Sequence, residues 1–176
     1  DFKGMKIRAS RRTAMDVLTT LGASPVDMLI PEVYIALERG ILDAFIINWE
    51  AMMAFKIHEV TKYRTETPRG LWLDLLTIGM NKDTWNSLPP DVQGIFEELS
   101  GAYMSKFSGE AFDRADNHLR EVITGIDKKV GKPDIYKVPE SEFQNWEKAV
   151  EPVHDLWIKR IKEKGLPGEA VLEKAR

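Results

Sequence analysis

Short strand-like runs alternate with helical stretches at the start of this chain, and that alternation limits the possible folds more than any other feature. Three runs have the length and composition of strands: residues 5–8, 24–29 and 41–48. Helical stretches lie between them, at residues 13–21 and 31–40, and are closed by Gly22 and Gly40. Strands that alternate with helices in this way form βαβ units on a mainly parallel sheet. The run at 41–48 is continuously apolar, which predicts a strand buried on both faces.

The rest of the chain is predicted to be mainly helical. Further strands are expected at residues 60–66, 71–81 and 134–138. A helix is expected after Trp49, and a short one further on with Asn81 or Asp83 as its N-cap. Five apolar residues share one helical stripe: Val92, Ile95, Phe96, Leu99 and Tyr103. The stripe predicts an amphipathic helix that continues through Ile126, and Pro152 is expected to break the final helical region.

The composition is that of an ordinary globular protein and excludes several kinds of function. With 176 residues, 43% of them hydrophobic and 30% charged, the chain can bury one core or form two small lobes. The formal net charge of −3 gives no electrostatic basis for binding nucleic acid. The absence of cysteine excludes disulfides, thiolate catalysis and cysteine-based zinc sites. No apolar run in the sequence approaches the ~20 residues of a membrane span.

No arrangement of reactive side chains indicates catalysis. His58, His118 and His154 are far apart in the sequence and lack the i, i+4 spacing of helical zinc ligands. Each histidine is therefore expected at the surface or half-buried. The glycine-rich phosphate-binding patterns and the Gly-x-Ser-x-Gly nucleophile motif are absent. We expect no catalytic residue, no metal and no cofactor.

Arg8 and Trp49 follow two predicted parallel strands, at the edge where open α/β sheets bind their ligands. Together they suit an organic acid, because a guanidinium pairs with the carboxylate and an apolar wall contacts the rest of the ligand. Two plainer interpretations stand beside this one. Arg8 can be a surface residue whose aliphatic stem covers the strand end, and Trp49 can be a core residue.

Four segments carry a resemblance to a known family. They are DFKGMKIRAS, LGASPVDMLIPEVYIALERGILDA, FKIHEVTKY and MNKDTWNSLPPDVQGIFEE, in matching order and spacing. They resemble the solute-binding proteins of TRAP transporters, the dicarboxylate-transporter receptor (DctP) family. The resemblance is nearly gap-free from Asp1 to about Leu99 and looser beyond. It implies an α/β fold: a periplasmic-binding-protein type II-like lobe with a mainly parallel sheet, followed by a helical C-terminal half.

The resemblance also implies a function and a role for Arg8. The family consists of periplasmic, two-lobed receptors that close around an organic acid and deliver it to a membrane permease. Arg8 matches the arginine at the end of the Lys-x-Arg strand, which pairs with the ligand carboxylate. Arg11 matches a position that is a ligand-contacting asparagine in relatives with polar ligands. Ile30 matches an aromatic position of the pocket.

Departures from the family pattern bear on the ligand. Many relatives read Asp-Gly-Gln-Glu-Asn-Pro after the buried strand, and their asparagine binds the ligand. This chain has Ala44 for the glycine, Ile47 for that asparagine and Asn48 for the proline, whereas Trp49 continues a Pro-Trp-Glu signature of one subgroup.

The apolar replacements favour an apolar ligand. Phe45 and Ile47 would leave the hydroxyl groups of a sugar acid without partners. An apolar monocarboxylate fits better, aromatic acids among them. Arg11 argues the other way, for a second acidic group.

The length of the chain is the largest departure. Family members are longer, and DFKGMKIR normally begins their second lobe. Residues 1–75 are then expected to form the second ligand-binding lobe, 76–130 to cross to the first lobe and pack on it, and 131–176 to return. The chain begins at Asp1 without an initiator methionine or a signal-like stretch, as a mature product or a fragment would. Such a fragment would bind its missing N-terminal lobe or self-associate.

Two other functions remain open on the sequence. One is a small α/β enzyme with Arg8 as the substrate anchor, although the first 100 residues lack an evident nucleophile, base or metal set. The other is a receptor-derived module that docks on a protein partner. The leading interpretation is a non-enzymatic organic-acid receptor, or the C-terminal part of one, which works with the subunits of a TRAP permease.

Overall fold

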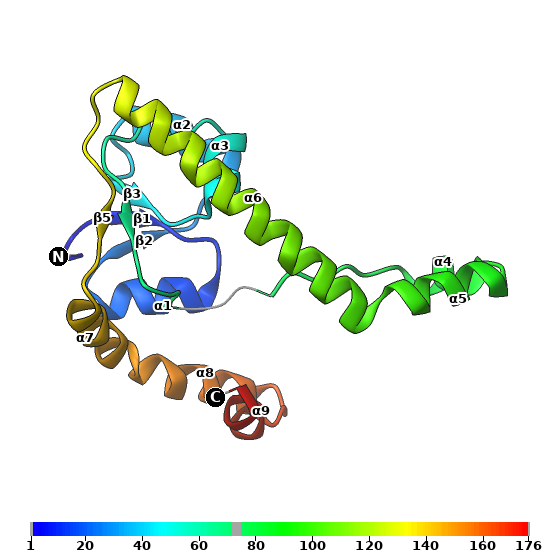
Figure 1. The fold of residues 1–176 in the computed structure, drawn as a ribbon. Coiled ribbons are helices and arrows are strands. Elements are labelled where there is room, and N and C mark those ends of the chain that lie inside the picture. Colours follow the sequence, from blue (N-terminus) through cyan, green and yellow to red (C-terminus); the bar gives the residue numbers. More distant parts are fainter. Residues whose placement is uncertain (1, 72–74, 176) are drawn as a thin grey trace.

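The computed structural model describes residues 2–71 and 75–175. The chain forms a packed lobe and an arm that projects from it (Figure 1). We define the arm as residues 75–110 and the lobe as the other described residues. The arm contains two short helices and the beginning of a long one, which runs back into the lobe.

A three-stranded sheet lies at the centre of the lobe. Its strands are β1 (Lys6–Arg8), β2 (Ser24–Val26) and β3 (Ala44–Phe45), in the order β2-β1-β3. Both strand pairs are parallel, so the carboxyl ends of all three strands meet at one edge. The predicted parallel sheet is thereby confirmed.

The third strand is shorter than its sequence predicts. Only Ala44 and Phe45 of residues 41–48 form a strand, and both are half-buried rather than buried on both faces. The backbone N–H groups of Ile41 and Leu42 donate instead to the carbonyl of Ala36, at 2.8 and 3.2 Å. These bonds hold the start of the run against the preceding helix, so it cannot extend the sheet.

Three helices and two apolar clusters cover this sheet. The helices are α1 (Arg12–Thr20), α2 (Ile30–Glu38) and α3 (Trp49–Ala54), close to the predicted positions. The α1 cluster consists of Ile7, Ala9, Ala14, Leu18 and Ala23. The α2–α3–α6 cluster consists of Val33, Ala36, Leu42, Met52, Ile57 and Ile123. In Figure 1 the sheet lies between α1 on one side and α2 and α3 on the other.

The long helix α6 (Gly101–Lys129) is fixed to the lobe at its C-terminal end. There Asp127 is buried and forms ion pairs with Arg64 at 3.2 Å and with Lys132 at 3.4 Å. Arg64 and Lys132 also donate to the carbonyl of His58, at 2.9 and 2.5 Å. Burial lowers the pKa of Arg64, and the charge of Asp127 opposes that shift. These contacts form a buried anchor of two cations, one carboxylate and a backbone carbonyl.

A second, two-stranded sheet lies beside this anchor. Strand β4 (Thr65–Glu66) pairs in parallel with β5 (Tyr136–Lys137). Each strand has two residues, whereas the sequence predicted strands at 60–66 and 134–138. Glu66 accepts two hydrogen bonds from Arg120 of α6, at 2.6 and 2.7 Å. These bonds hold the pKa of the Glu66 carboxyl below its usual value. The pair joins the small sheet to the middle of α6.

The C-terminal helices lie on the α1 side of the lobe (Figure 1). Helices α7 (Glu140–Val150) and α8 (Pro152–Glu163) contact α1, and α9 (Gly168–Ala175) packs on α8. Pro152 separates the first two, as predicted, and forms the first turn of α8. Arg160 of α8 pairs with Asp16 of α1 at 2.5 Å, and Arg69 pairs with two glutamates of α7.

The arm differs from the prediction in two places. The strand expected at 71–81 is wrong for residues 75–81, which form no strand, whereas 72–74 lie outside the described residues. The long helical region is divided into α5 (Pro90–Leu99) and α6, because the chain turns at Gly101 with φ of +59°. The short helix α4 (Lys82–Ser87) is confirmed, with Asn81 as its N-cap.

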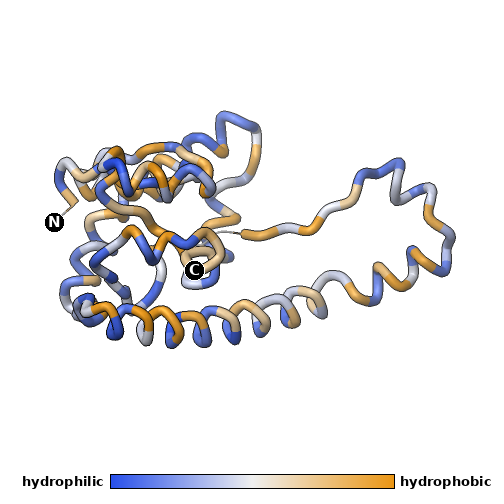
Figure 2. The backbone as a smooth tube through the Cα atoms, turned by 90° about the horizontal axis from the view of Figure 1, so that it is seen from above, coloured by the Kyte–Doolittle hydropathy of each residue, from blue (hydrophilic) through white to orange (hydrophobic). Residues whose placement is uncertain are grey.

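Apolar side chains on the arm face solvent. In Figure 2 the extended segment and α6 leave the lobe separately and join through α4 and α5. The exposed residues there are Leu75, Leu76, Ile78, Met80, Ile95, Phe96, Leu99, Tyr103 and Phe107. Within residues 2–71 and 75–175, no helix has the length and apolar character needed to cross a bilayer.

Candidate functional site

The carboxyl edge of the three-stranded sheet is built around Arg8. Arg8 is the last residue of the central strand, and it is paired in register with Val26 of β2 and Phe45 of β3. Its Nε donates to the carbonyl oxygen of Met28 at 3.0 Å. This bond fixes the plane of the guanidinium group at the sheet edge.

Arg8 is buried even in this chain by itself. The residue is 7% exposed, so the plainer interpretation of Arg8 as a surface residue is wrong. Burial follows from its central position, since the segments after β2 and β3 extend past it on both sides. A buried guanidinium that is oriented by the backbone is well suited to bind a carboxylate.

Four of the other predicted site residues are half-buried. Ile30 begins α2, Phe45 ends β3, Ile47 follows it, and Trp49 begins α3. All four pack against the α2–α3–α6 cluster. Trp49 therefore has a core contact, which the plainer interpretation expected. The sheet places Arg8 beside Phe45, because the two residues are paired in register. Ile47 and Trp49 lie two and four residues after Phe45 in the sequence.

Arg11 and Asn48 are exposed residues next to helix starts. Arg11 precedes α1 and Asn48 precedes α3, and neither side chain caps its helix. Both positions are near the carboxyl edge, because each lies three residues after the last residue of a strand. Their predicted contacts with a ligand stay predictions.

The sequence interpretation overlooked Leu29 and Ile46 at the same edge. Both are large, apolar and exposed, and each stands between two residues that pack in the core. A signal for them exists in the sequence, because side chains in extended segments alternate between two faces. If residues 28, 30, 45 and 47 face the core, residues 29 and 46 face the other way.

His58 lies beside the anchor at the C-terminal end of α6. His58 is buried, which corrects the expectation of a surface or half-buried histidine, because its segment lies beneath the anchor of Arg64 and Lys132. In the described part of the chain, no three His, Asp or Glu side chains are grouped so that they could hold a metal ion.

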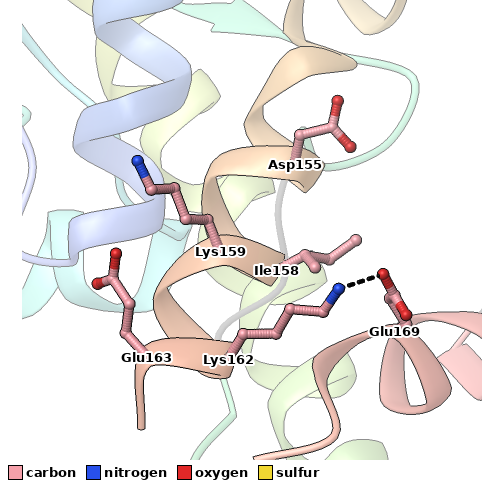
Figure 3. A pocket seen from close by; sticks show the side chains of 6 residues that line it. All are labelled: Asp155, Ile158, Lys159, Lys162, Glu163 and Glu169. Carbon is pink, nitrogen blue, oxygen red and sulfur yellow. Dashed lines mark hydrogen bonds and ion pairs between the residues drawn. The ribbon is translucent and has the colours of Figure 1, made fainter.

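A hollow on the surface lies between α8 and α9 (Figure 3). It is lined by Asp155, Ile158, Lys159, Lys162, Glu163 and Glu169. Lys162 and Glu169 pair with each other across it at 2.6 Å, and the remaining charges are of both signs. None of these residues belongs to the sheet edge, and we do not assign the hollow to the site around Arg8.

Comparison with known proteins identifies relatives of the whole chain. The family described as "Bacterial extracellular solute-binding protein, family 7" (DctP) matches residues 1–160. The C4-dicarboxylate-binding periplasmic protein DctP of Rhodobacter capsulatus is 30% identical over 162 residues, which cover 92% of this chain. Those residues make up 46% of that protein, so the chain spans about half the length of this relative.

Solved structures share the fold. A TRAP solute-binding protein from Rhodoferax ferrireducens T118, in complex with copurified benzoate, has a TM-score of 0.83 at 29% identity. A marine metagenome TRAP solute-binding protein specific for aromatic acid ligands, in complex with metahydroxyphenylacetate, has a TM-score of 0.83 at 26% identity. Each comparison covers 99% of this chain, and 53% and 54% of the respective structures.

Proposed function

The chain belongs to the DctP family of bacterial extracellular solute-binding proteins, and we propose that it forms the second half of a receptor that captures an organic acid for a TRAP-type permease. The observation that carries this proposal is Arg8. It is buried, stands at the end of the central parallel strand and is oriented by the Met28 carbonyl. A bidentate, charge-assisted pair with a carboxylate is what such a guanidinium forms best.

The proposed ligand is a carboxylate with an apolar body. Phe45, Ile47 and Trp49 surround the strand end with apolar surface, and a sugar acid would lose hydrogen bonds there. The benzoate and metahydroxyphenylacetate found in two similar structures support this choice. Ile30, Arg11 and Asn48 complete the proposed ligand-contacting set. Arg11 would bring a second positive charge to the rim of the site.

The two regions of the chain have separate roles in this proposal. Residues 1–75 and 131–176 form the second lobe, and 76–130 cross to a first lobe supplied by the rest of the receptor. The C-terminal end of α6 is an exception within 76–130, because Ile123 and Asp127 pack in the second lobe. The apolar side chains of the arm support this division, because a partner lobe would cover them. The family places such receptors in the periplasm, where the closed receptor would meet the permease subunits.

Substitution of Arg8 tests the proposal. In the complete polypeptide that contains this chain, Arg8→Lys should lose the bidentate geometry and cost about 1–3 kcal/mol of affinity for benzoate. Arg8→Ala should cost at least as much. Arg39→Ala is the matched control, because Arg39 is an exposed arginine at the opposite end of α2. Calorimetric titration gives both affinities.

Two results would contradict the proposal. If Arg8→Ala bound benzoate with unchanged affinity, Arg8 would have only a structural role. Conversion of the bound acid, detected by product analysis after incubation, would replace a receptor with the α/β enzyme considered above. We expect the acid to be recovered unchanged.

A further inference from the structure

The first turn of α3 is held by a residue of another helix. α3 begins at Trp49, and the side chain of Asn48 before it forms no capping hydrogen bond. Backbone N–H groups in the first turn of a helix have no acceptor within that helix, so they need one from elsewhere. Here the backbone N–H of Glu50 donates to Oδ1 of Asp116 at 3.0 Å. Asp116 belongs to α6, 66 residues further along the chain.

Asp116 lies on the face of α6 that is turned to the lobe. Residues 116, 120, 123 and 127 recur at steps of four, three and four, and they therefore share one face of the helix. Arg120 is bound to Glu66. Ile123 belongs to the α2–α3–α6 cluster, and Asp127 belongs to the anchor. Of Asp116, Arg120 and Asp127, the first lies nearest to the arm.

The bond from Glu50 fixes a peptide group next to the proposed site. The N–H of Glu50 belongs to the peptide that joins Trp49 to Glu50, so an acceptor that holds this N–H also restrains the backbone of Trp49. Trp49 is half-buried and packs against the α2–α3–α6 cluster. Asp116 is half-buried too, and a charge-assisted hydrogen bond is stronger there than in open water.

We propose that Asp116 is a positioning residue of the binding site, which holds Trp49 where its indole contacts the apolar body of the acid. In this role Asp116 acts through the Trp49–Glu50 peptide and does not touch the ligand. Because α6 also carries the arm, the position of Trp49 depends on the helix that leads to the first lobe. This inference rests on the receptor function proposed above.

The physical reason is the fraction of molecules that are ready to bind. Without the acceptor on Asp116, the start of α3 can leave its place, and fewer molecules present Trp49 in the binding position. The apparent affinity falls in proportion to that fraction. The carboxylate contact with Arg8 lies on a different strand and is not affected.

Substitution of Asp116 in the complete polypeptide measures this effect. Asp116→Ala should weaken benzoate binding about three- to tenfold, the change in population that corresponds to the loss of one hydrogen bond. Asp116→Asn keeps an acceptor oxygen and should stay within about twofold of the unsubstituted protein. Asp113→Ala is the matched control and should leave the affinity unchanged, because Asp113 is an exposed aspartate of the same helix. Calorimetric titration gives the affinities.

A double-substitution cycle asks whether Asp116 acts through Trp49. Adding Asp116→Ala to Trp49→Ala should cause no further loss of benzoate affinity, because the side chain that Asp116 positions is already gone. An equal loss in the presence and absence of Trp49 would indicate a general effect on the fold and would overturn the inference. Unchanged affinity in Asp116→Ala would also overturn it, while the receptor function stands.

Fluorine NMR tests the position of Trp49 without any ligand. The protein is labelled with fluorotryptophan, and the Trp49 signal is the one that disappears in Trp49→Phe. In the ligand-free protein, Asp116→Ala should shift or broaden that signal, whereas Asp113→Ala should not. If the unsubstituted protein bound no benzoate, the receptor proposal would fail, but this spectrum would still decide whether Asp116 holds Trp49. An unchanged Trp49 signal in Asp116→Ala would show that it does not.

Discussion

Apolar residues are buried at one end of helix α6 and exposed at the other. Near the C-terminal end, Ile123 is 0% exposed and belongs to the α2–α3–α6 cluster. Near the N-terminal end, Phe107 is 56% exposed and stacks only on Tyr103, among the described ring contacts. The helix itself is continuous from Gly101 to Lys129. The difference lies in what packs against it.

The comparison shows that, among the described residues, the lobe has a buried core and the arm has none. The lobe end of α6 has core contacts, the Arg64–Asp127 anchor and the Glu66–Arg120 pair. On the arm, the described ion pairs of Glu110 with Lys106 and Arg114 are exposed and lie within the helix. Helical stability in proteins comes mainly from the packing of an amphipathic face, and on the arm much of that face is exposed.

The largest effect is expected at the buried anchor. Asp127→Ala should lower the free energy of unfolding by about 3–5 kcal/mol, because it leaves the buried Arg64 and the half-buried Lys132 without their carboxylate. Glu110→Ala, which breaks exposed pairs on the arm, should cost less than about 1 kcal/mol. Urea titration of the 176-residue chain measures both values. Equal effects of the two substitutions would show that the lobe and the arm are not stabilised differently.

Apolar truncation along α6 should give the next largest contrast. Ile123→Ala is expected to destabilise by about 2–5 kcal/mol, the range for deleting a fully buried aliphatic side chain. Phe107→Ala should stay within about 0.5 kcal/mol, because Phe107 is more than half exposed and belongs to neither of the described core clusters. Thermal and urea unfolding at low protein concentration report both. A large loss for Phe107→Ala would mean that the arm is packed in solution.

The exposed face of the arm should make the isolated chain self-associate. Replacing Ile95 or Phe107 with Asp should raise the dissociation constant of the dimer about tenfold or more, since a charge would enter an apolar contact. Ile41→Asp, on the lobe, is the control and should leave it unchanged. Sedimentation over a range of concentrations gives the constants. A chain that stays monomeric at high concentration would contradict the prediction.

The smallest effect is expected from acid titration of Glu66. Its pKa is lowered in the folded state by the hydrogen bonds from Arg120. A carboxyl with a lowered pKa stabilises the fold above its ordinary pKa of 4.5, and this contribution is lost as the pH falls through the folded value.

We expect the Glu66 contribution to be about 1 kcal/mol, because the pair is partly exposed. Glu66→Gln should therefore lower the stability at neutral pH and flatten its fall as the pH drops below about 5. The unfolding free energy as a function of pH measures both. Glu110→Gln, on the arm, is the control and should leave the shape of that profile unchanged. If Glu66→Gln and the unsubstituted chain gave the same profile, Glu66 would not be the source of this pH dependence.

The sequence predicted the lobe better than the arm, for a physical reason. In the lobe, the glycines at positions 22 and 40, with φ of +90° and +66°, act locally, so their pattern determined the helix ends. The strand predicted at 71–81 is apolar, but a strand also needs a neighbour to accept its hydrogen bonds. Residues 75–81 have no neighbouring strand in the described chain, and no local pattern reports that.

The site was predicted in part, with the same division between local and distant causes. The position of Arg8 followed from its strand and from the parallel order of the sheet. Its burial did not, because it depends on how far the segments after β2 and β3 extend beyond β1. Similarly, the sequence identified Ile30 and Ile47 as apolar residues of the site. It did not show that they pack against the core while Leu29 is exposed, because that alternation depends on where the strands end.

The anchored helix α6 also acts as a mechanical lever. Its 29 residues form a rod about 44 Å long, at about 1.5 Å per residue. Contacts of Asp116, Arg120 and Asp127 hold the C-terminal part of the helix to the lobe, and the part from Gly101 to Asp116 extends beyond them. That part is about 22 Å long at about 1.5 Å per residue, so a tilt of about 5° at Asp116 displaces its far end by about 2 Å. Adjustments too small to disturb the packing of the lobe are thereby magnified along the arm.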